Sequence, residues 1–141
     1  MKIVLVQPKE NIWIRSRTVS LGLGYIAAVL EKAGHSVRII DQRVTPDAEI
    51  TDADLVGVTA TTPTINQAWT ILKTAKEKSN AVTVIGGPHV SALPEESALL
   101  PYVDYVVKGE GEITMLELCG SLQKGTAVSE VRGLYTNKTA E

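Results

Sequence analysis

The sequence predicts an α/β domain in which one parallel sheet of five strands is covered by helices on both faces, giving three layers. Three observations lead to this prediction. The chain has 141 residues, about the size of one ordinary domain, and 44% of them are apolar, which supplies a core. Several short apolar runs lack the polar alternation of half-exposed strands, as expected for strands buried on both faces. Segments with apolar residues at helical spacing separate these runs, which indicates βαβ crossovers.

The elements follow in order along the chain. A β-branched apolar run at residues 3–6 predicts the first strand, which Pro8 follows. Residues 21–32 carry apolar side chains at helical spacing, with Ser20 as a cap and Gly34 after the last turn, so they predict the first helix. The same alternation predicts strands at 37–41, 55–59, 82–85 and 103–107, and helices at 64–78, 94–100 and 113–122.

Two stretches fit this alternation less well. Residues 41–54 carry a weak signal and are expected to form a loop or a single turn. Residues 131–135 resemble one further short strand that no helix follows, so we expect the polypeptide to be part of a longer one. The complete pattern is that of a doubly wound, Rossmann-like sheet in the flavodoxin-like arrangement.

Composition excludes several classes of function. Lys and Arg number 14 against 16 Asp and Glu, so no basic surface for nucleic acid is expected, and the 4% of aromatic residues disfavours base stacking. The lone Cys119 excludes an internal disulfide, a four-cysteine zinc site and an iron–sulfur cluster held by this chain alone, and it fits a reducing cytoplasm. No apolar run has the length of a signal peptide or a membrane span, so no membrane partner is expected.

The loops that follow the strands hold the candidate binding residues. In an open α/β sheet the ligand lies beyond the carboxyl ends of the strands, because backbone amides and helix N-termini converge there. Three short loops at this edge are small, hydroxylated or glycine-rich. They are Thr59, Ala60, Thr61 and Thr62 after the third strand, Gly86, Gly87, Pro88 and His89 after the fourth, and Gly109, Glu110, Gly111 and Glu112 after the fifth. Each has a structural alternative, since threonines cap helices, glycine pairs form plain turns, and glutamates favour the positive end of a helix.

Familiar nucleotide and phosphate sites do not fit the pattern. The run from Gly22 to Ala27 matches G-x-G-x-x-A, but about fifteen residues separate it from the first strand, whereas the fingerprint must turn directly from strand to helix. A phospho-receiver domain would need an Asp where the third strand ends at Thr59. A flavodoxin would carry its hydroxyl-rich loop after the first strand rather than after the third.

No motif for catalysis or metal binding is present in the sequence. It has no G-x-S-x-G elbow, no H-E-x-x-H and no H-x-E with a downstream C-x-x-C. His35 is expected at the surface or at a helix cap, and Cys119 is expected to be a core thiol among apolar neighbours. His89 either contacts a ligand or is structural. No catalytic residue and no metal ligand is predicted within the chain.

Five segments in sequence order carry a more specific signal. They are LGLGYIAAVLE at 21–31 with AGH at 33–35, DLVGVTATTP at 54–63, GGPHV at 86–90, LPE at 93–95 and VDYVVKGEGE at 103–112. Together they resemble the N-terminal cobalamin-binding domain of B12-dependent radical SAM enzymes, over nearly the whole chain. Residues 131–135 resemble the segment that leads out of that domain. The resemblance implies a cobalamin-binding domain at 1–130 and, at 131–141, the start of a linker to a radical SAM domain.

The resemblance also implies a set of cofactor-binding residues. The corrin would lie across the carboxyl ends of the strands, and its nucleotide tail would enter the sheet edge. Thr59, with Ala60 and Thr61 beside it, would hydrogen-bond the benzimidazole, and Gly86 and Gly87 would let the tail pass. The remaining members of the expected set are Thr62, Pro88, His89, Gly109, Glu110, Gly111, Leu21, Gly22 and Gly24. We expect a bulky residue at either Gly86 or Gly87 to abolish corrinoid binding while leaving the fold intact.

One departure concerns cobalt. Related mutase-type domains carry a cobalt-ligating His in D-x-H-x-x-G after the first strand, and residues 7–12 of this chain contain no His. The resemblance therefore implies a base-off, His-off cobalamin whose lower face meets water or a non-His residue of the loop 8–19. The parent enzyme would be a radical SAM methyltransferase or a relative of the Mg-protoporphyrin monomethyl ester oxidative cyclase. Its 4Fe-4S cluster and S-adenosylmethionine would lie in another part of the polypeptide. A stand-alone α/β domain that binds a nucleotide or another small ligand without B12 remains the alternative.

Overall fold

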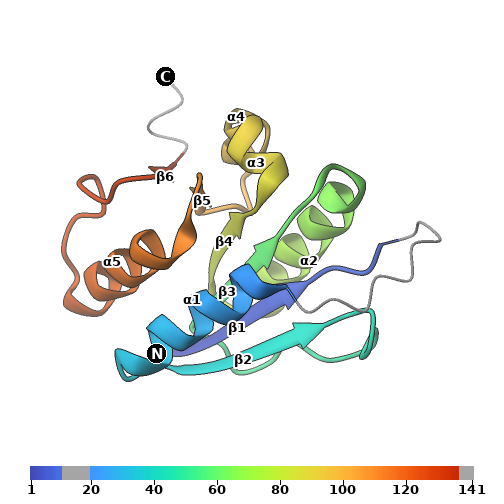
Figure 1. The fold of residues 1–141 in the computed structure, drawn as a ribbon, viewed down its shortest axis with the longest axis horizontal. Coiled ribbons are helices and arrows are strands. Elements are labelled where there is room, and N and C mark those ends of the chain that lie inside the picture. The colour runs from blue at the N-terminus through green and yellow to red at the C-terminus, as the bar shows by residue number, and fades with distance from the viewer. Residues whose placement is uncertain (11–19, 137–141) are drawn as a thin grey trace.

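Six strands form one sheet in the order β2-β1-β3-β4-β5-β6 (Figure 1). The computed structural model describes residues 1–10 and 20–136 of the chain. The strands are β1 Lys2–Gln7, β2 Ser36–Asp41, β3 Leu55–Thr59, β4 Val82–Gly86, β5 Tyr105–Val107 and β6 Leu134–Tyr135. The first five are parallel, in the predicted flavodoxin-like order, so their carboxyl ends lie at one edge.

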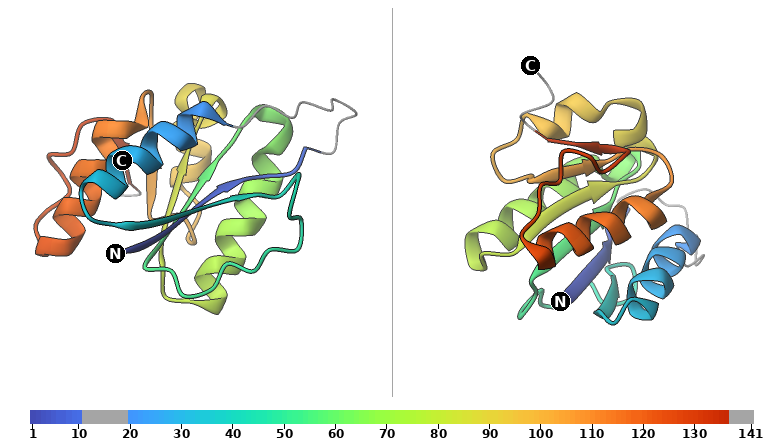
Figure 2. Two further views of the ribbon diagram at one scale, coloured as in Figure 1. Left: turned by 60° about the horizontal axis from the view of Figure 1, so that its bottom comes forward. Right: turned by 90° about the vertical axis from the view of Figure 1, so that its left-hand side faces the viewer.

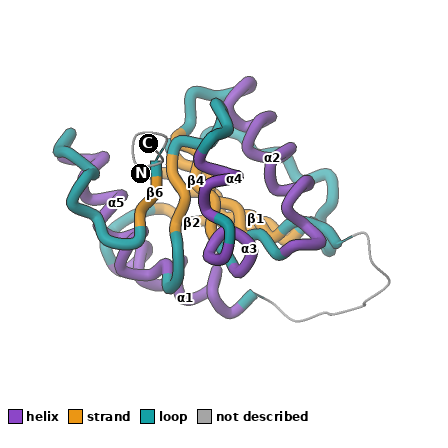
Figure 3. The backbone as a smooth tube through the Cα atoms, turned by 90° about the horizontal axis from the view of Figure 1, so that it is seen from above, coloured by secondary structure: helices purple, strands orange, loops and turns teal. Residues whose placement is uncertain are grey.

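Helices cover both faces of the sheet and complete the three predicted layers (Figures 2 and 3). They are α1 Leu21–Lys32, α2 Ile65–Lys78, α3 Pro88–Ala92, α4 Pro94–Ala98 and α5 Gly111–Lys124. One apolar cluster joins α1 and α5 to side chains such as Leu5 and Val84 on one face of the sheet. A second cluster joins α2, α3 and α4 to side chains such as Val6 and Val58 on the other face.

The sixth strand is a difference from the predicted five-stranded parallel sheet. Of the short strand predicted at 131–135, only β6 forms, and it pairs antiparallel with β5. Gly133, at φ +78°, turns the chain back, and its carbonyl accepts a hydrogen bond from the Lys108 backbone N–H at 2.8 Å. This turn is what brings β6 alongside β5.

Two other boundaries differ for local reasons. Helix α3 was not expected, because five residues are too few to show helical spacing; Pro88 begins it. Strand β5 begins at Tyr105 rather than at 103. Just before it, one backbone bond, from Asp104 N to Thr83 O at 3.1 Å, is joined by a side-chain bond in which the Asp104 carboxylate accepts from the Thr83 backbone N–H at 2.8 Å.

His35 is buried, with 8% of its surface exposed, rather than at the surface. Its backbone N–H donates to Leu30 O at 3.1 Å, which caps α1 as expected. Its Nδ1 lies 3.4 Å from the amino group of Met1. Burial, and secondarily the positive charge of that amino group, lower the pKa of the His35 imidazole.

This lowered pKa predicts a loss of stability in mild acid. The unfolded chain takes up the proton with the ordinary pKa of 6.5, whereas the folded chain resists protonation until a lower pH. We therefore expect the free energy of unfolding to fall as the pH drops below 6.5, measured from urea midpoints at pH 7.5 and 5.5. The variant His35→Gln should show a smaller fall, and equal falls in both proteins would contradict the assignment.

Candidate functional site

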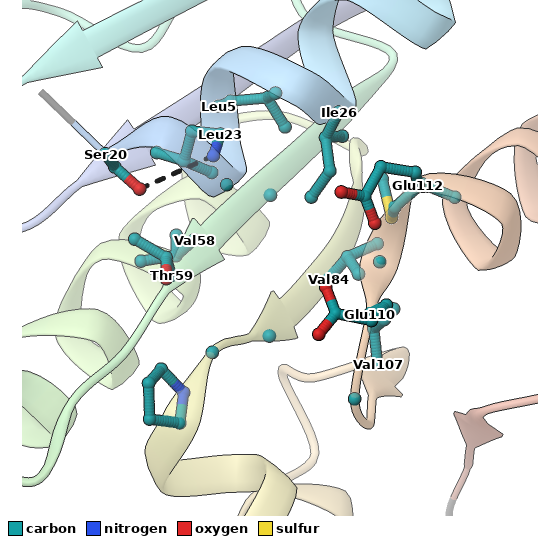
Figure 4. Close-up of a pocket in the computed structure, with 18 residues that line it drawn as sticks. Leu5, Ser20, Leu23, Ile26, Val58, Thr59, Val84, Val107, Glu110 and Glu112 are labelled. Carbon is teal, nitrogen blue, oxygen red and sulfur yellow. Dashed lines mark hydrogen bonds between the residues drawn. The ribbon is translucent and has the colours of Figure 1, made fainter.

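A pocket of about 310 Å³ opens at the carboxyl edge of the sheet, between α1 and α5 (Figure 4). Its wall combines the ends of four strands with the first turns of these two helices. The lining residues are Leu5, Ser20, Gly22, Leu23, Ile26, Gly57, Val58, Thr59, Val84, Gly86, Gly87, Pro88, Val107, Gly109, Glu110, Gly111, Glu112 and Met115. The pocket therefore lies where open α/β sheets bind their ligands.

Two glycines, Gly57 and Gly86, lie at the floor of this pocket and contribute no side chain to it. Successive strand residues point to opposite faces, so Leu55, Gly57 and Thr59 of β3 share the face covered by α1 and α5. A Cβ on Gly57 would lie 2.9 Å from Leu5 Cδ2, closer than van der Waals contact. A Cβ on Gly86 would lie 3.7 Å from the nearest atom, Val107 O, an ordinary contact. Glycine at position 86 leaves backbone open at the pocket, whereas Leu5 packs over the buried Gly57.

Polar groups stand around this apolar floor. The Thr59 hydroxyl lines the pocket and makes no hydrogen bond to any described residue. Ser20 Oγ accepts from Leu23 N at 3.4 Å and so caps α1. The residue at the equivalent position of α5, Glu110, makes no side-chain cap, which leaves first-turn N–H groups of α5 free at the pocket. The pocket thus offers a free hydroxyl and free amide donors beside an apolar surface.

Two carboxylates give the α5 side of the pocket a negative charge. Glu110 and Glu112 both extend toward the pocket in Figure 4. Within residues 1–10 and 20–136, neither forms an ion pair. This favours a ligand that presents N–H or O–H donors here rather than an anionic group.

Eight of the predicted binding residues line the pocket: Gly22, Thr59, Gly86, Gly87, Pro88, Gly109, Glu110 and Gly111. Six lie outside the lining: Leu21, Gly24, Ala60, Thr61, Thr62 and His89. Ala60 is buried beneath the wall, and the Thr61 side chain takes part in a capping box with Thr64. The capping role was the structural alternative for these threonines.

The two glycines after β4 have different roles. Gly87 has φ +103° and ψ 177°, a region that only glycine adopts readily, and a Cβ there would lie 2.6 Å from Ala60 O and 2.7 Å from Ala60 N. The expectation that a bulky residue at Gly87 leaves the fold intact is therefore wrong. It remains reasonable for Gly86, where a Cβ meets only ordinary contacts.

Several lining residues were not predicted as binding residues. They are Leu5, Ser20, Leu23, Ile26, Gly57, Val58, Val84, Val107 and Met115, whereas Glu112, a candidate of the loop after the fifth strand, lines the pocket as well. Most are core residues by sequence pattern, and nothing local distinguishes them from other core residues. Gly57 is the exception, because a glycine inside an apolar strand indicates a close approach of another group.

The thiol and the cobalt-ligand expectations have different outcomes. Cys119 is fully buried, and burial raises the pKa of its thiol to about 11, which confirms a core thiol rather than a nucleophile.

Among the described residues, no group of three or more His, Cys, Asp or Glu side chains is gathered for a metal ion, and no helix is long and apolar enough to cross a membrane. Of the loop 8–19, which was expected to meet cobalt, residues 11–19 lie outside the described part of the chain.

Known proteins resemble this chain in both sequence and fold. Residues 13–119 match the family model of the B12 binding domain. An uncharacterized methyltransferase of Pyrococcus horikoshii is 38% identical over 95% of the chain and 32% of its own length. The anaerobic magnesium-protoporphyrin IX monomethyl ester cyclase of Rubrivivax gelatinosus is 34% identical over 77% of the chain and 21% of its own length.

A solved structure has the same fold. It is the radical S-adenosylmethionine methyltransferase TsrM from Kitasatospora setae, with cobalamin and a 4Fe-4S cluster bound. It aligns with a TM-score of 0.80 and 24% identity over 96% of the chain and 27% of TsrM. The chain thus spans about a third or less of the length of the relatives that it matches.

Proposed function

Because this chain belongs to the family of B12 binding domains, we propose that the pocket between α1 and α5 receives the nucleotide tail of cobalamin. The observation that carries the proposal is the glycine floor of the pocket. Gly86 leaves backbone open at the pocket, Gly57 lies buried beneath Leu5 in the floor, and a flat aromatic base needs such a surface without projecting side chains to lie close to a sheet. A nucleotide tail also presents hydroxyls and ring nitrogens, which need polar partners at the rim.

The residues around the floor suit such a tail. The Thr59 hydroxyl, free of protein partners among the described residues, can donate to a ring nitrogen. The free first-turn N–H groups of α5 can donate to ribose oxygens, and the Glu110 and Glu112 carboxylates can accept from ribose hydroxyls. Leu5, Ile26 and Met115 supply apolar contact for the base. Bound in this way, cobalamin would supply a cobalt centre that carries a transferable group.

We further propose that cobalamin binds base-off and His-off. The first strand is followed by Pro8, Lys9 and Glu10, and no His stands anywhere in residues 8–19, so no imidazole from this loop can replace the benzimidazole. Tail burial in the pocket removes the benzimidazole from cobalt. Water, or a non-His residue of the loop 8–19, would then meet the lower face.

The parent protein, in this proposal, is a cobalamin-dependent radical SAM enzyme, either a methyltransferase or a relative of the oxidative cyclase. Relatives named as methyltransferases and a cyclase support it. The 4Fe-4S cluster and S-adenosylmethionine would be held by another part of the same polypeptide, in the cytoplasm, where the free thiol of Cys119 stays reduced. This chain would bind the cofactor and leave the chemistry to its partner domain.

The test is retention of a corrinoid by the chain itself. The purified protein is incubated with hydroxocobalamin, desalted, and its visible spectrum recorded at neutral and acidic pH. We expect retained corrinoid with a base-off spectrum at neutral pH. Retention of a nucleotide such as FMN or NAD in place of the corrinoid would favour the alternative of a nucleotide-binding α/β domain. A base-on spectrum would contradict burial of the tail.

A further inference from the structure

His89 lies beside the pocket without lining it, and both of its ring nitrogens are already engaged. The side chain is buried, with 8% exposed. Nδ1 lies 3.1 Å from the Thr62 hydroxyl, and Nε2 lies 3.3 Å from Glu96 Oε2. A carboxylate can only accept, so Nε2 of the ring carries a proton and donates to Glu96, and Nδ1 shares a hydrogen bond with the Thr62 hydroxyl. A ligand could reach this imidazole only by breaking one of these bonds.

The backbone around His89 joins the same two loops. The His89 N–H donates to Ala60 O at 3.1 Å, and Ala60 N–H donates to Gly86 O at 2.9 Å. The pairing of β3 with β4 ends at Thr59 opposite Gly86. Beyond that point, contacts of this kind, rather than a sheet ladder, hold the loop after β3 against the helices after β4.

The position of His89 matters because residues adjacent in the chain to His89 and to Ala60 line the pocket. Thr59, next to Ala60, and Pro88, next to His89, both line the pocket. Thr62 begins the single-turn 3-10 helix Thr62–Thr64 after β3, whereas Glu96 comes from α4. The ring of His89 therefore links three segments behind a wall to which the ring itself does not contribute.

We propose that His89 is a positioning residue for the pocket: through Thr62 and Glu96 it holds Thr59 and Pro88 at the spacing that cobalamin requires. This inference rests on the proposed function of the pocket. The sequence left two roles open for His89, a ligand contact or a structural role. This proposal assigns the structural role, in which the imidazole holds the pocket wall in place without contacting the ligand. Loss of the ring removes the bonds with Thr62 and Glu96 while leaving every lining residue unchanged.

The first arm of the test measures affinity for hydroxocobalamin by visible absorbance. His89→Ala should weaken binding by about tenfold, the effect of losing one or two hydrogen bonds. His89→Asn, whose carboxamide can take the place of Nδ1 opposite Thr62, should recover most of that loss. Thr62→Val removes the same bond from the other side, so the double variant with His89→Ala should bind no more weakly than His89→Ala alone. Additive losses, or no rescue by asparagine, would overturn the positioning role.

The second arm needs no ligand. Hydrogen exchange of the backbone amides at 59–62, 87 and 89 should speed up in His89→Ala, and much less in His89→Asn, while amides in β1 and α5 keep their rates. Faster exchange throughout the molecule would indicate a general loss of stability and overturn the proposal. If the unmodified chain fails to bind hydroxocobalamin, the proposed function fails; unchanged exchange at 59–62 would separately refute the role of His89.

Discussion

Replacement of Gly86 by leucine is expected to weaken hydroxocobalamin binding by ~100-fold or more while the chain still folds, because a buried side chain would fill the space of the tail. Gly86 lines the pocket, and its missing Cβ would make only ordinary contacts with Val107. The added atoms beyond Cβ would therefore occupy the pocket rather than displace the protein. Affinity is measured by visible titration, and folding by thermal unfolding.

The matched control is Gly120→Leu. Gly120 lies in α5, outside the pocket lining, and a Cβ there meets nothing within 4 Å. This variant should bind hydroxocobalamin like the unmodified chain. Undiminished binding by Gly86→Leu, in a folded protein, would place the tail elsewhere and contradict the proposed pocket.

Replacement of the neighbouring Gly87 by alanine should have a different effect, a loss of about 3 kcal/mol or more in the free energy of unfolding. Two costs combine there. The backbone has φ +103°, and the new Cβ would lie 2.6 Å from Ala60 O, a backbone atom that the sheet holds in place. The loop after β3 would have to move, and the hydrogen bond from His89 N to Ala60 O would be strained or lost.

Gly34→Ala separates the two costs, because Gly34 has φ +90° but nothing within 4 Å of a new Cβ. It should lose only about 1 kcal/mol, the conformational part alone. Urea unfolding of the two variants measures the difference. Equal losses in the free energy of unfolding at the two positions would mean that Ala60 moves aside at little cost and that its contact with residue 87 does not hold the pocket wall in place.

Much of the fold follows from local pattern. The five parallel strands and the four helices α1, α2, α4 and α5 were predicted to within two residues, because buried strands and amphipathic helices carry their own periodicity. The edge of the sheet that bears the pocket follows as well, since parallel βαβ units place all carboxyl ends together. What local pattern missed was the five-residue helix α3 and the antiparallel pairing of the two-residue strand β6 with β5, although a short strand at 131–135 was predicted. Elements of that size depend on turns and on partners rather than on periodicity.

The sequence by itself determined the fold class, the family resemblance and the loops that border the pocket, because each is encoded in neighbouring residues. Only the tertiary structure decided which of those residues reach the ligand space. A Cβ on Gly86 would meet only ordinary contacts at the pocket, whereas a Cβ on Gly87 would lie 2.6 Å from Ala60 O, although the two glycines are adjacent in the chain. The tertiary structure also placed His89 behind the wall, bonded to Thr62 and Glu96. The contacts with Ala60 and Thr62 join segments that are more than 20 residues apart in the chain, and no local spacing records the packing of one loop against another.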